Sequence, residues 1–319
     1  MLVEYVCANY GIIGESVHFP LYAGTDSKTE PDLNHTNNIY SYKKSEQVRF
    51  YPTTVLFGNN GSGKSVLVES MATMQQIVTN DINRSQKIFV PNYGNTKKGT
   101  LFSVNLLVRG VWYHYEFTIK NGAIEEEQLC VGITGKDKKN RFVIKNRGKT
   151  IYTRKQNKVT FGKSFKKTVF KEALSLMKPN VPLLTCASKT VKECKDVYQF
   201  FAKSLMIVKD REMYALKTLK ENEDIKQIVL NALNDLCYRI TDIRVDDGSK
   251  RFEHTSKNLL KEYGYNVELS KKGGKTPYTA TIIKDKCSVA FHNESDGLKS
   301  LICIMTQIAE AILREKVLV

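Results

Sequence analysis

The feature that most restricts this chain is the octapeptide Gly58-Asn59-Asn60-Gly61-Ser62-Gly63-Lys64-Ser65. It fits G-x-x-x-x-G-K-[ST], the pattern of a phosphate-binding loop. The last part of 48–57 reads as a buried strand, and residues 66–77 place apolar side chains at helical spacing. A strand, a glycine-rich turn and a helix in this order are the context that the motif needs. The sequence therefore predicts a site for a nucleoside triphosphate.

The chemistry of such a site explains these residue types. Glycines let the backbone curl, so that several N–H groups point at phosphate oxygens, and a helix that starts near Lys64 adds its positive end. We expect Lys64 to reach the β- and γ-phosphates as a point charge, and the Ser65 hydroxyl to ligate Mg²⁺. The alternative is a glycine-rich turn in which Lys64 and Ser65 follow by accident.

Composition excludes several other classes. The 319 residues are 41% hydrophobic and 26% charged, which is ordinary for a soluble globular protein. No apolar run approaches the length of a membrane span, and residues 1–6 alternate like a strand rather than forming a signal peptide. The seven cysteines show no C-x-x-C spacing and the histidines show no metal-ligand spacing. We therefore expect a cytoplasmic protein with reduced thiols and without a zinc site.

Positive charge is concentrated in one tract. The formal net charge is +16, and residues 136–171 carry fourteen Lys and Arg against a single acid, Asp137. A single-sign patch of this density is a candidate surface for the phosphate backbone of DNA or RNA, with Lys163, Lys166 and Lys167 as candidate contacts. The tract holds no base-reading motif, so no sequence specificity is inferred. The alternative is a solvated basic hairpin without a partner.

Periodicity and turn residues predict the remaining elements. Strands are expected at 2–9 and 14–20, and residues 21–46 read as a long loop. The region 87–161 is β-rich, with turns at Arg109-Gly110 and Asn121-Gly122, and its Trp112 is expected in the core rather than on a nucleobase. Further helices and strands are expected at these positions: helices at 165–178, 190–204 and 222–238, an apolar strand at 181–186, strands within 239–291, and a helix capped by Ser295 before an apolar strand at 316–319.

These features together resemble one family. A phosphate-binding loop near residue 60 follows a β-hairpin, a β-rich lobe comes next, and a Ser-x-Gly turn (Ser295-Asp296-Gly297) opens a long helix ahead of an apolar strand. The order is similar to that of ATP-binding-cassette-like (ABC-like) head ATPases of the overcoming-lysogenization-defect and abortive-infection group, AAA-type proteins of phage defence. The resemblance covers essentially the whole chain. It implies an α/β fold of the P-loop NTPase class, an ABC-ATPase-like head with a β-rich lobe and a C-terminal signature-type helix.

The resemblance also implies partners and further site residues. In such heads the Ser-x-Gly turn reaches across a dimer to the γ-phosphate of ATP bound by the other subunit, so Ser295 and Gly297 would act in trans. ATP with Mg²⁺ would drive a homodimer or a head-to-head pair, and a nuclease or another effector would be the controlled partner. Gln128 is a weak candidate for the family's Q-loop glutamine. The alternative for Ser295 is an ordinary capping serine.

The chain departs from the family pattern at its end. Family members follow the last apolar strand with an Asp-Glu pair, the Walker B acids, and this sequence stops at Val319, where the pair should begin. The resemblance thus implies a chain truncated before those acids, in which ATP hydrolysis is doubtful. Asp210, after the apolar residues 205–208, precedes the Ser-x-Gly turn against the family's order and reads better as the end of a structural strand.

The domain expectation is a single head over 1–319, with four segments: the strands and phosphate loop (1–86), the basic β-rich lobe (87–164), a helical and strand insertion (165–290) and the signature-like helix with a truncated strand (291–319). Two other functions stay open. One is a P-loop kinase of small molecules, disfavoured because the basic block lies in a strand-like lobe. The other is a nucleic-acid-binding module whose phosphate loop is only regulatory.

Overall fold

The chain folds into a mixed α/β structure whose largest element is a seven-stranded antiparallel sheet. The computed structural model describes residues 1–23, 40–42, 48–51, 53–79, 98–132, 134–136, 142–144, 148–208, 211–247, 278–285 and 287–319. They divide into two units, Met1–Leu205 and Met206–Val319. The boundary falls within the segment 165–290 that the sequence assigned to one insertion.

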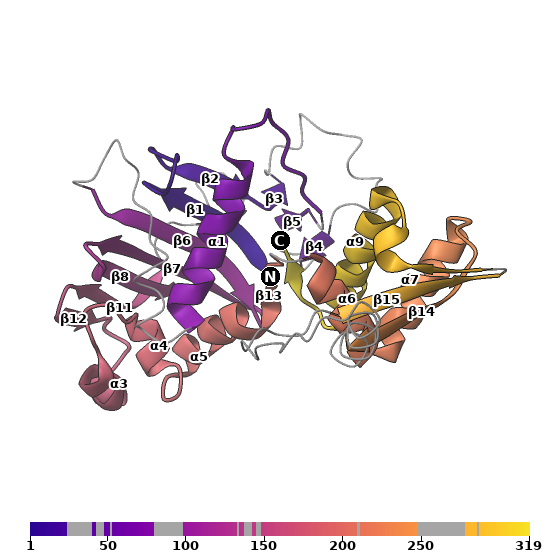
Figure 1. Cartoon of the computed structure of the whole chain (residues 1–319). Coiled ribbons are helices and arrows are strands. Elements are labelled where there is room, and N and C mark those ends of the chain that lie inside the picture. The colour runs from indigo at the N-terminus through magenta and orange to yellow at the C-terminus, as the bar shows by residue number, and fades with distance from the viewer. Residues whose placement is uncertain are drawn as a thin grey trace, which may run out of the picture. The chain divides into compact units, whose positions relative to one another are not determined.

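The first unit is organised by the large sheet, whose strand order is β12-β11-β8-β7-β6-β1-β2 (Figure 1). All neighbouring strands in it are antiparallel. It therefore joins the predicted N-terminal hairpin to the predicted β-rich region in one layer. Its strands are β1 (Leu2–Ala8), β2 (Val17–Pro20), β6 (Thr100–Val108), β7 (Val111–Lys120), β8 (Ala123–Val131), β11 (Lys149–Lys155) and β12 (Lys158–Phe161).

Two predicted turns set the register of the central strands. Arg109 and Gly110 have φ of 49° and 79°, and Asn121 and Gly122 have φ of 52° and 72°. Two consecutive residues with positive φ are typical of the type I′ turn, whose twist suits a two-residue hairpin. These short-range signals confirm the β6–β7 and β7–β8 hairpins, and Trp112 is buried beside Phe50, with ring centroids 6.0 Å apart.

Helix α1 (Lys64–Thr79) lies across one face of this sheet (Figure 1). Its apolar side is buried, and two hydroxyl contacts attach it to the N-terminal strand and turn. The Tyr5 hydroxyl donates to Ser70 Oγ at 2.8 Å, and the hydroxyls of Tyr10 and Thr73 are also 2.8 Å apart. The helix that begins at the predicted phosphate loop is therefore fixed to β1 and to the turn that follows it.

A helical segment completes the first unit. It contains the 3₁₀ turn η2 (Lys167–Phe170), the helices α3 (Lys171–Leu176), α4 (Leu183–Ala187) and α5 (Lys192–Gln199), and the π-helix η3 (Phe200–Ser204).

The prediction of a strand at 181–186 is wrong, because α4 begins at Leu183 and residues 181–182 form no strand. The N–H groups of Leu183 and Leu184 donate to the carboxylate of Glu127, at 2.7 and 2.9 Å. A carboxylate that accepts from the first N–H groups stabilises a helix start, and it comes from a strand far away in the sequence.

Short strands make two smaller sheets in the first unit. The segment 21–46 was expected to hold no helix or strand, yet residues 22–23 and 40–42 form short strands. One sheet has the order β3-β5-β4 and the other joins β10 to β9. Their strands are β3 (Tyr22–Ala23), β4 (Tyr40–Tyr42), β5 (Val48–Phe50), β9 (Thr134–Lys136) and β10 (Phe142–Ile144).

The second unit packs helices against a three-stranded antiparallel sheet of order β14-β15-β16. Helix α6 was not predicted, whereas α7 and α9 were. The core of this unit is mainly aliphatic and comes from the helices and from β14 and β15, with Leu233 and Ile302 among its most buried residues. The elements are α6 (Arg211–Glu221), α7 (Glu223–Asp235), β14 (Ile240–Asp247), β15 (Tyr278–Lys284), β16 (Cys287–Ala290), the 3₁₀ turn η4 (Phe291–Asn293) and α9 (Asp296–Leu313).

The apolar strand predicted at 316–319 is short. Strand β17 (Val317–Leu318) forms a two-stranded sheet with β13 (Leu205–Met206), and the N–H of Val319 donates to the carbonyl of Met206 at 2.9 Å. Among the described residues, β13 is the only strand that pairs with β17.

A buried carboxylate ties the end of α9 to α6. Glu310 is 2% exposed and accepts hydrogen bonds from Tyr214 at 2.5 Å, Arg314 at 2.9 Å and Lys316 at 2.8 Å. Burial by itself would raise the pKa of Glu310, but the hydrogen bonds from Lys316 and Tyr214 and the two nearby cations outweigh it, so the pKa is lowered.

This carboxylate predicts an acid-sensitive second unit. Since the pKa of Glu310 is lower in the folded state, its stabilisation is present above the unfolded pKa, near 4.5, and is lost as pH falls through the folded value. We expect Glu310→Gln to destabilise the chain at neutral pH by about 1–3 kcal/mol, with a difference that shrinks toward acid. Urea unfolding over a pH series measures it, with the exposed Glu223→Gln as control. A pH-independent difference would contradict the assignment.

In the parts of the chain that the structure describes, no helix combines the length and the apolar character needed to cross a membrane.

Candidate nucleotide-binding site

The predicted phosphate loop is a turn that leads directly into α1. The N–H of Ser62 donates to the carbonyl of Asn59 at 3.2 Å, and the first helical bond runs from Leu67 N–H to Gly63 O at 2.9 Å. Gly61 and Gly63 have φ of 83° and 93°, a region in which other residues are strained. The two glycines thus make the reversal that the motif requires, and residues 58–62 are exposed to solvent.

Lys64 closes this loop. Its ammonium donates to the carbonyls of Gly58 and Asn59, at 2.6 and 2.7 Å, and lies 3.3 Å from Ser62 Oγ. The side chain therefore curls back over the backbone of the preceding turn instead of extending into solvent. A single positive charge stands within an exposed loop, at the positive end of a sixteen-residue helix.

Gly58 lies close to the side chain of Ser62. A Cβ added at Gly58 would lie 2.6 Å from Ser62 Oγ, which is nearer than such atoms approach. A larger residue at 58 would therefore displace the Ser62 hydroxyl. At Gly61, by contrast, an added Cβ would meet nothing within 4 Å, so its constraint is the backbone φ alone.

The turn after β1 supports the loop from beneath. A Cβ added at Gly63 would be 3.3 Å from Cδ1 of Ile12, and one added at Gly11 would be 3.0 Å from Cγ1 of Val66. These contacts place the turn between the two N-terminal strands against the start of α1. The predicted hairpin thus has a structural role at the loop, which its sequence spacing alone did not indicate.

The strand expected immediately before the loop is not formed. Residues 53–57 have no strand conformation. Pro52 lies outside the described residues. Val55 is 62% exposed and Phe57 is 89% exposed. An apolar run becomes a buried strand only when a neighbouring strand pairs with it, and no described residue does so here. The prediction of a helix after the loop is confirmed, whereas the prediction of a strand immediately before the loop is wrong.

The Ser-x-Gly turn is a helix start in the second unit. Ser295 has extended backbone angles and its Oγ accepts from the N–H of Leu298 at 3.3 Å, so it is the N-cap of α9. A Cβ added at Gly297 would meet nothing within 4 Å, and its φ lies outside the left-handed region. The fold of this unit therefore uses Ser295 but does not itself need glycine at 297.

Other predicted site residues stay apart from the loop or outside the described residues. Gln128 lies within β8 and its amide donates to Cys130 Sγ at 3.0 Å. Asp210 falls outside the residues that the structure describes. The described residues contain no group of three His, Cys, Asp or Glu side chains placed to hold a metal ion. Ser65, the Mg²⁺ ligand that the motif predicts, is exposed in the first turn of α1.

The basic tract loses one member to the interior. Arg154 is fully buried, and its guanidinium donates to the carbonyls of Gln156, Lys178 and Val181. Lys155 is paired with Glu126 at 3.0 Å. Lys163, Lys166 and Lys167 are exposed, as a surface for phosphates requires.

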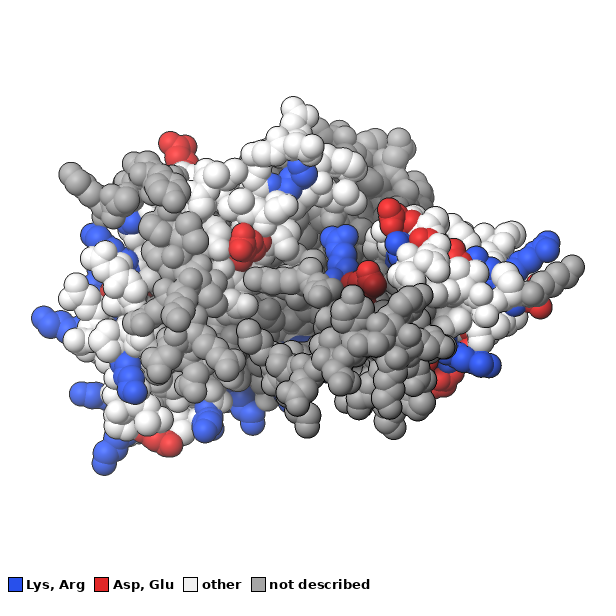
Figure 2. All heavy atoms as spheres, in the orientation of Figure 1, with Lys and Arg blue, Asp and Glu red and all other residues white. Residues whose placement is uncertain are grey.

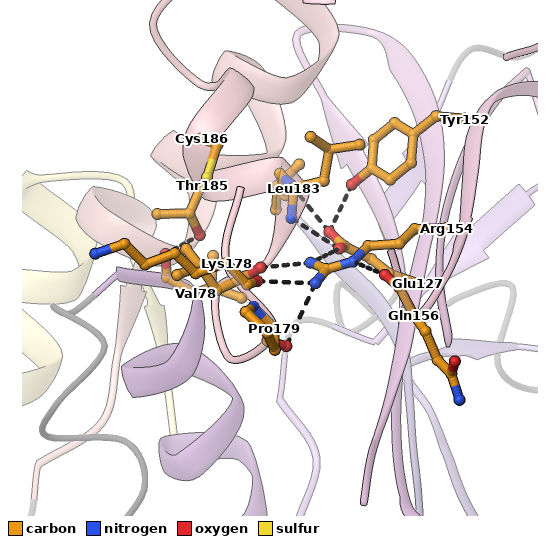
Figure 3. Close-up of polar contacts among 12 residues, drawn as sticks. Val78, Glu127, Tyr152, Arg154, Gln156, Lys178, Pro179, Leu183, Thr185 and Cys186 are labelled. Carbon is orange, nitrogen blue, oxygen red and sulfur yellow. Dashed lines mark hydrogen bonds and ion pairs between the residues drawn. The ribbon is translucent and has the colours of Figure 1, made fainter. Parts of the chain in front are cut away.

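The buried partner of Arg154 is a carboxylate that the sequence did not single out. Glu127 lies 3.6 Å from the guanidinium and also accepts from the hydroxyl of Tyr152, at 2.7 Å (Figure 3). It accepts as well from the hydroxyl of Tyr115, at 3.2 Å. Burial first, and then the charge of Glu127, raises the pKa of both tyrosines well above the usual value.

This cluster has no access for a substrate. Both charged side chains are 0% exposed, and the lone pairs of Glu127 are taken by two tyrosines, an arginine and two backbone N–H groups. The cluster fixes α4 to the sheet and is structural. A signal for it was present in the sequence, since Glu127 shares the inward side of its strand with Leu129.

Comparison with known proteins adds no family. The chain matches no protein-family model, and no curated protein is significantly similar to it.

Proposed function

We propose that this chain is an ATP-binding head of the ABC-like type, as in the overcoming-lysogenization-defect and abortive-infection ATPases of phage defence. The observation that carries the proposal is the Lys64 ammonium, held inside an exposed glycine loop at the start of α1. When ATP binds, its phosphates replace the carbonyls of Gly58 and Asn59 as partners of that charge. Ser65, exposed in the first turn of α1, ligates the Mg²⁺ that accompanies the nucleotide.

The second element of the proposal is dimerisation. Ser295 and Gly297 approach the γ-phosphate of ATP held by another copy, and the absence of a side chain at 297 lets that phosphate come close to the backbone. Support comes from Gly297 itself, since the second unit does not need glycine there. ATP-driven pairing then controls a nuclease or another effector in the cytoplasm, and hydrolysis is not assigned to the described residues.

Two other functions make different predictions. A small-molecule kinase binds ATP and stays monomeric while it transfers phosphate. A nucleic-acid-binding module with a regulatory loop pairs, if at all, without regard to Gly297. The dependence of the oligomeric state on ATP therefore separates the proposal from both.

We expect ATP with Mg²⁺ to shift the whole chain from monomer to dimer, as measured by size-exclusion chromatography with light scattering. Gly297→Val puts a branched side chain where the phosphate must approach, so this variant should bind ATP normally and remain monomeric. Ser288→Val, on an exposed position of β16 in the same unit, is the matched control and should still dimerise.

Three results would contradict the proposal. They are a dimer that forms equally well without ATP, a Gly297→Val chain that pairs as readily as the control, and a chain that binds no ATP at all.

A further inference from the structure

Exposed lysines cover the helical segment of the first unit. The segment 163–203, all of which the structure describes, carries nine lysines, and every one of them is exposed. We name this set the lysine strip. Its members are Lys163, Lys166, Lys167, Lys171, Lys178, Lys189, Lys192, Lys195 and Lys203.

The acids of the same segment do not neutralise this strip. It contains three, and Asp196 is 3% exposed because it accepts from Tyr113 at 3.2 Å and Arg109 at 3.3 Å on the inner side of α5. Glu172 and Glu193 remain. Among the described residues none of the nine lysines is in an ion pair with an acid. The outward charge of the segment is therefore strongly positive.

Figure 2 shows where this charge gathers. Blue side chains stand one after another along the edge of the first unit at the lower left, over the region that Figure 1 labels α3, α4 and α5, and little red interrupts them. The sequence tract ended at Lys171, whereas this surface continues through α5 to Lys203.

The strip is carried by a rigid base. The carbonyl of Lys178 accepts from buried Arg154 at 2.8 Å, while Figure 3 shows its side chain pointing away from the Glu127 cluster. Thr185 Oγ1 donates to Val78 O at 2.8 Å, which attaches α4 to α1. The segment that carries the strip is thus attached to the sheet at Lys178 and to α1 through α4.

We propose that the lysine strip binds the phosphate backbone of duplex nucleic acid. Lysine offers point charges that neutralise phosphates without reading bases. Single strands are held by exposed aromatic side chains on which bases stack. In segment 163–203 no aromatic residue is exposed: Phe165 and Tyr198 are half-buried, and Phe170, Phe200 and Phe201 are buried. A duplex, whose bases are already stacked, needs only the charges that this surface provides.

This surface is independent of the proposed nucleotide site. It lies on η2, α3, α5, η3 and the segments that precede and connect them, whereas the glycine loop lies at the start of α1. Binding should therefore persist in Lys64→Ala, and failure of either proposal leaves the other standing.

The test measures binding of the whole chain to fluorescent duplex DNA and duplex RNA of arbitrary sequence across a salt series. We expect a log–log slope close to −0.9 per phosphate neutralised. Two triple variants, Lys163, Lys166 and Lys167→Glu and Lys189, Lys192 and Lys195→Glu, should each weaken binding to every sequence alike and reduce the slope by about one per lysine removed.

The matched control changes charge by the same amount in the other unit. Arg211, Lys217 and Arg244 are exposed, and their joint replacement by Glu should leave binding and slope unchanged. Thermal melting of each variant checks that the fold is intact. An RNA-only or DNA-only result identifies the duplex and supports the proposal.

Four results would overturn it. An affinity for duplex that does not depend on salt would exclude phosphate contacts. An equal loss of affinity in the control triple would show that binding depends only on the net charge of the chain. If only the first triple weakens binding, the surface does not extend past Lys171. Binding to anionic phosphatidylserine vesicles without binding to either duplex would make the strip a membrane contact.

Discussion

Lys64→Ala is expected to lower the affinity of the chain for ATP by roughly a hundredfold. The ammonium is the one positive charge inside the glycine loop, where it already donates to Gly58 O and Asn59 O at 2.6 and 2.7 Å. A hydrogen bond between charged groups contributes up to about 3 kcal/mol, and each 1.4 kcal/mol is tenfold in Kd. Because these backbone contacts must be exchanged for phosphate, the net loss is smaller than the gross interaction.

Isothermal titration of the purified chain with ATP and Mg²⁺ measures this loss. Lys167→Ala is the matched control, since it removes one exposed lysine from the surface that would attract nucleotide phosphates non-specifically. Ser65→Ala should weaken binding only when Mg²⁺ is present, because its role is to ligate the metal. Equal ATP affinity in Lys64→Ala and Lys167→Ala would show that the loop is an ordinary glycine turn.

The elements whose conformation depends on residues close in the sequence were predicted correctly. Helix α1, the hairpin turns at Arg109-Gly110 and Asn121-Gly122, and the cap at Ser295 are all specified within a few positions, by glycine, turn and capping preferences. These elements were predicted with nearly their observed bounds. The glycine loop belongs to the same class, since its turn and its lysine lie within eight residues.

The wrong predictions of secondary structure concern segments whose conformation depends on residues distant in the sequence. The run 53–57 has strand-forming residues, but a strand needs a partner, and the apolar side chains of Val55 and Phe57 are exposed in its absence. Residues 181–186 were predicted as a strand, but Glu127, 56 positions before Leu183, accepts from the N–H of Leu183 and favours a helix. Neither partner could be identified from local periodicity.

The candidate site divides in the same way. The glycine turn at Gly61 and Gly63 and the helix start near Lys64 followed from the motif. The contact with Ile12 depends on the fold of the N-terminal hairpin. Only the first half of the lysine strip was predicted, because the prediction rested on the density of charge along residues 136–171. The sequence does not show that the Asp196 side chain is buried, which leaves the lysines after residue 171 without that neutralising charge.

The largest loss of stability is expected from Glu127→Ala. The substitution leaves the guanidinium of Arg154 buried with no carboxylate, and it removes the acceptor of two backbone N–H groups and of the Tyr115 and Tyr152 hydroxyls. Breaking a buried ion pair from one side costs about 3–5 kcal/mol, because the remaining charge and donors stay out of water. Arg154 keeps its contacts to backbone carbonyls, which limits the cost but does not neutralise its charge.

Urea unfolding followed by circular dichroism measures this effect, with Glu126→Ala as the neighbouring control. Glu126 is 57% exposed and its pair with Lys155 is worth at most about 1 kcal/mol. Glu127→Gln keeps the shape and one acceptor oxygen but removes the charge, so its stability should fall between the two alanine variants. If Glu127→Ala unfolds at the same urea concentration as Glu126→Ala, the carboxylate does not hold α4 to the sheet, and the rigid base assigned to the lysine strip is removed with it.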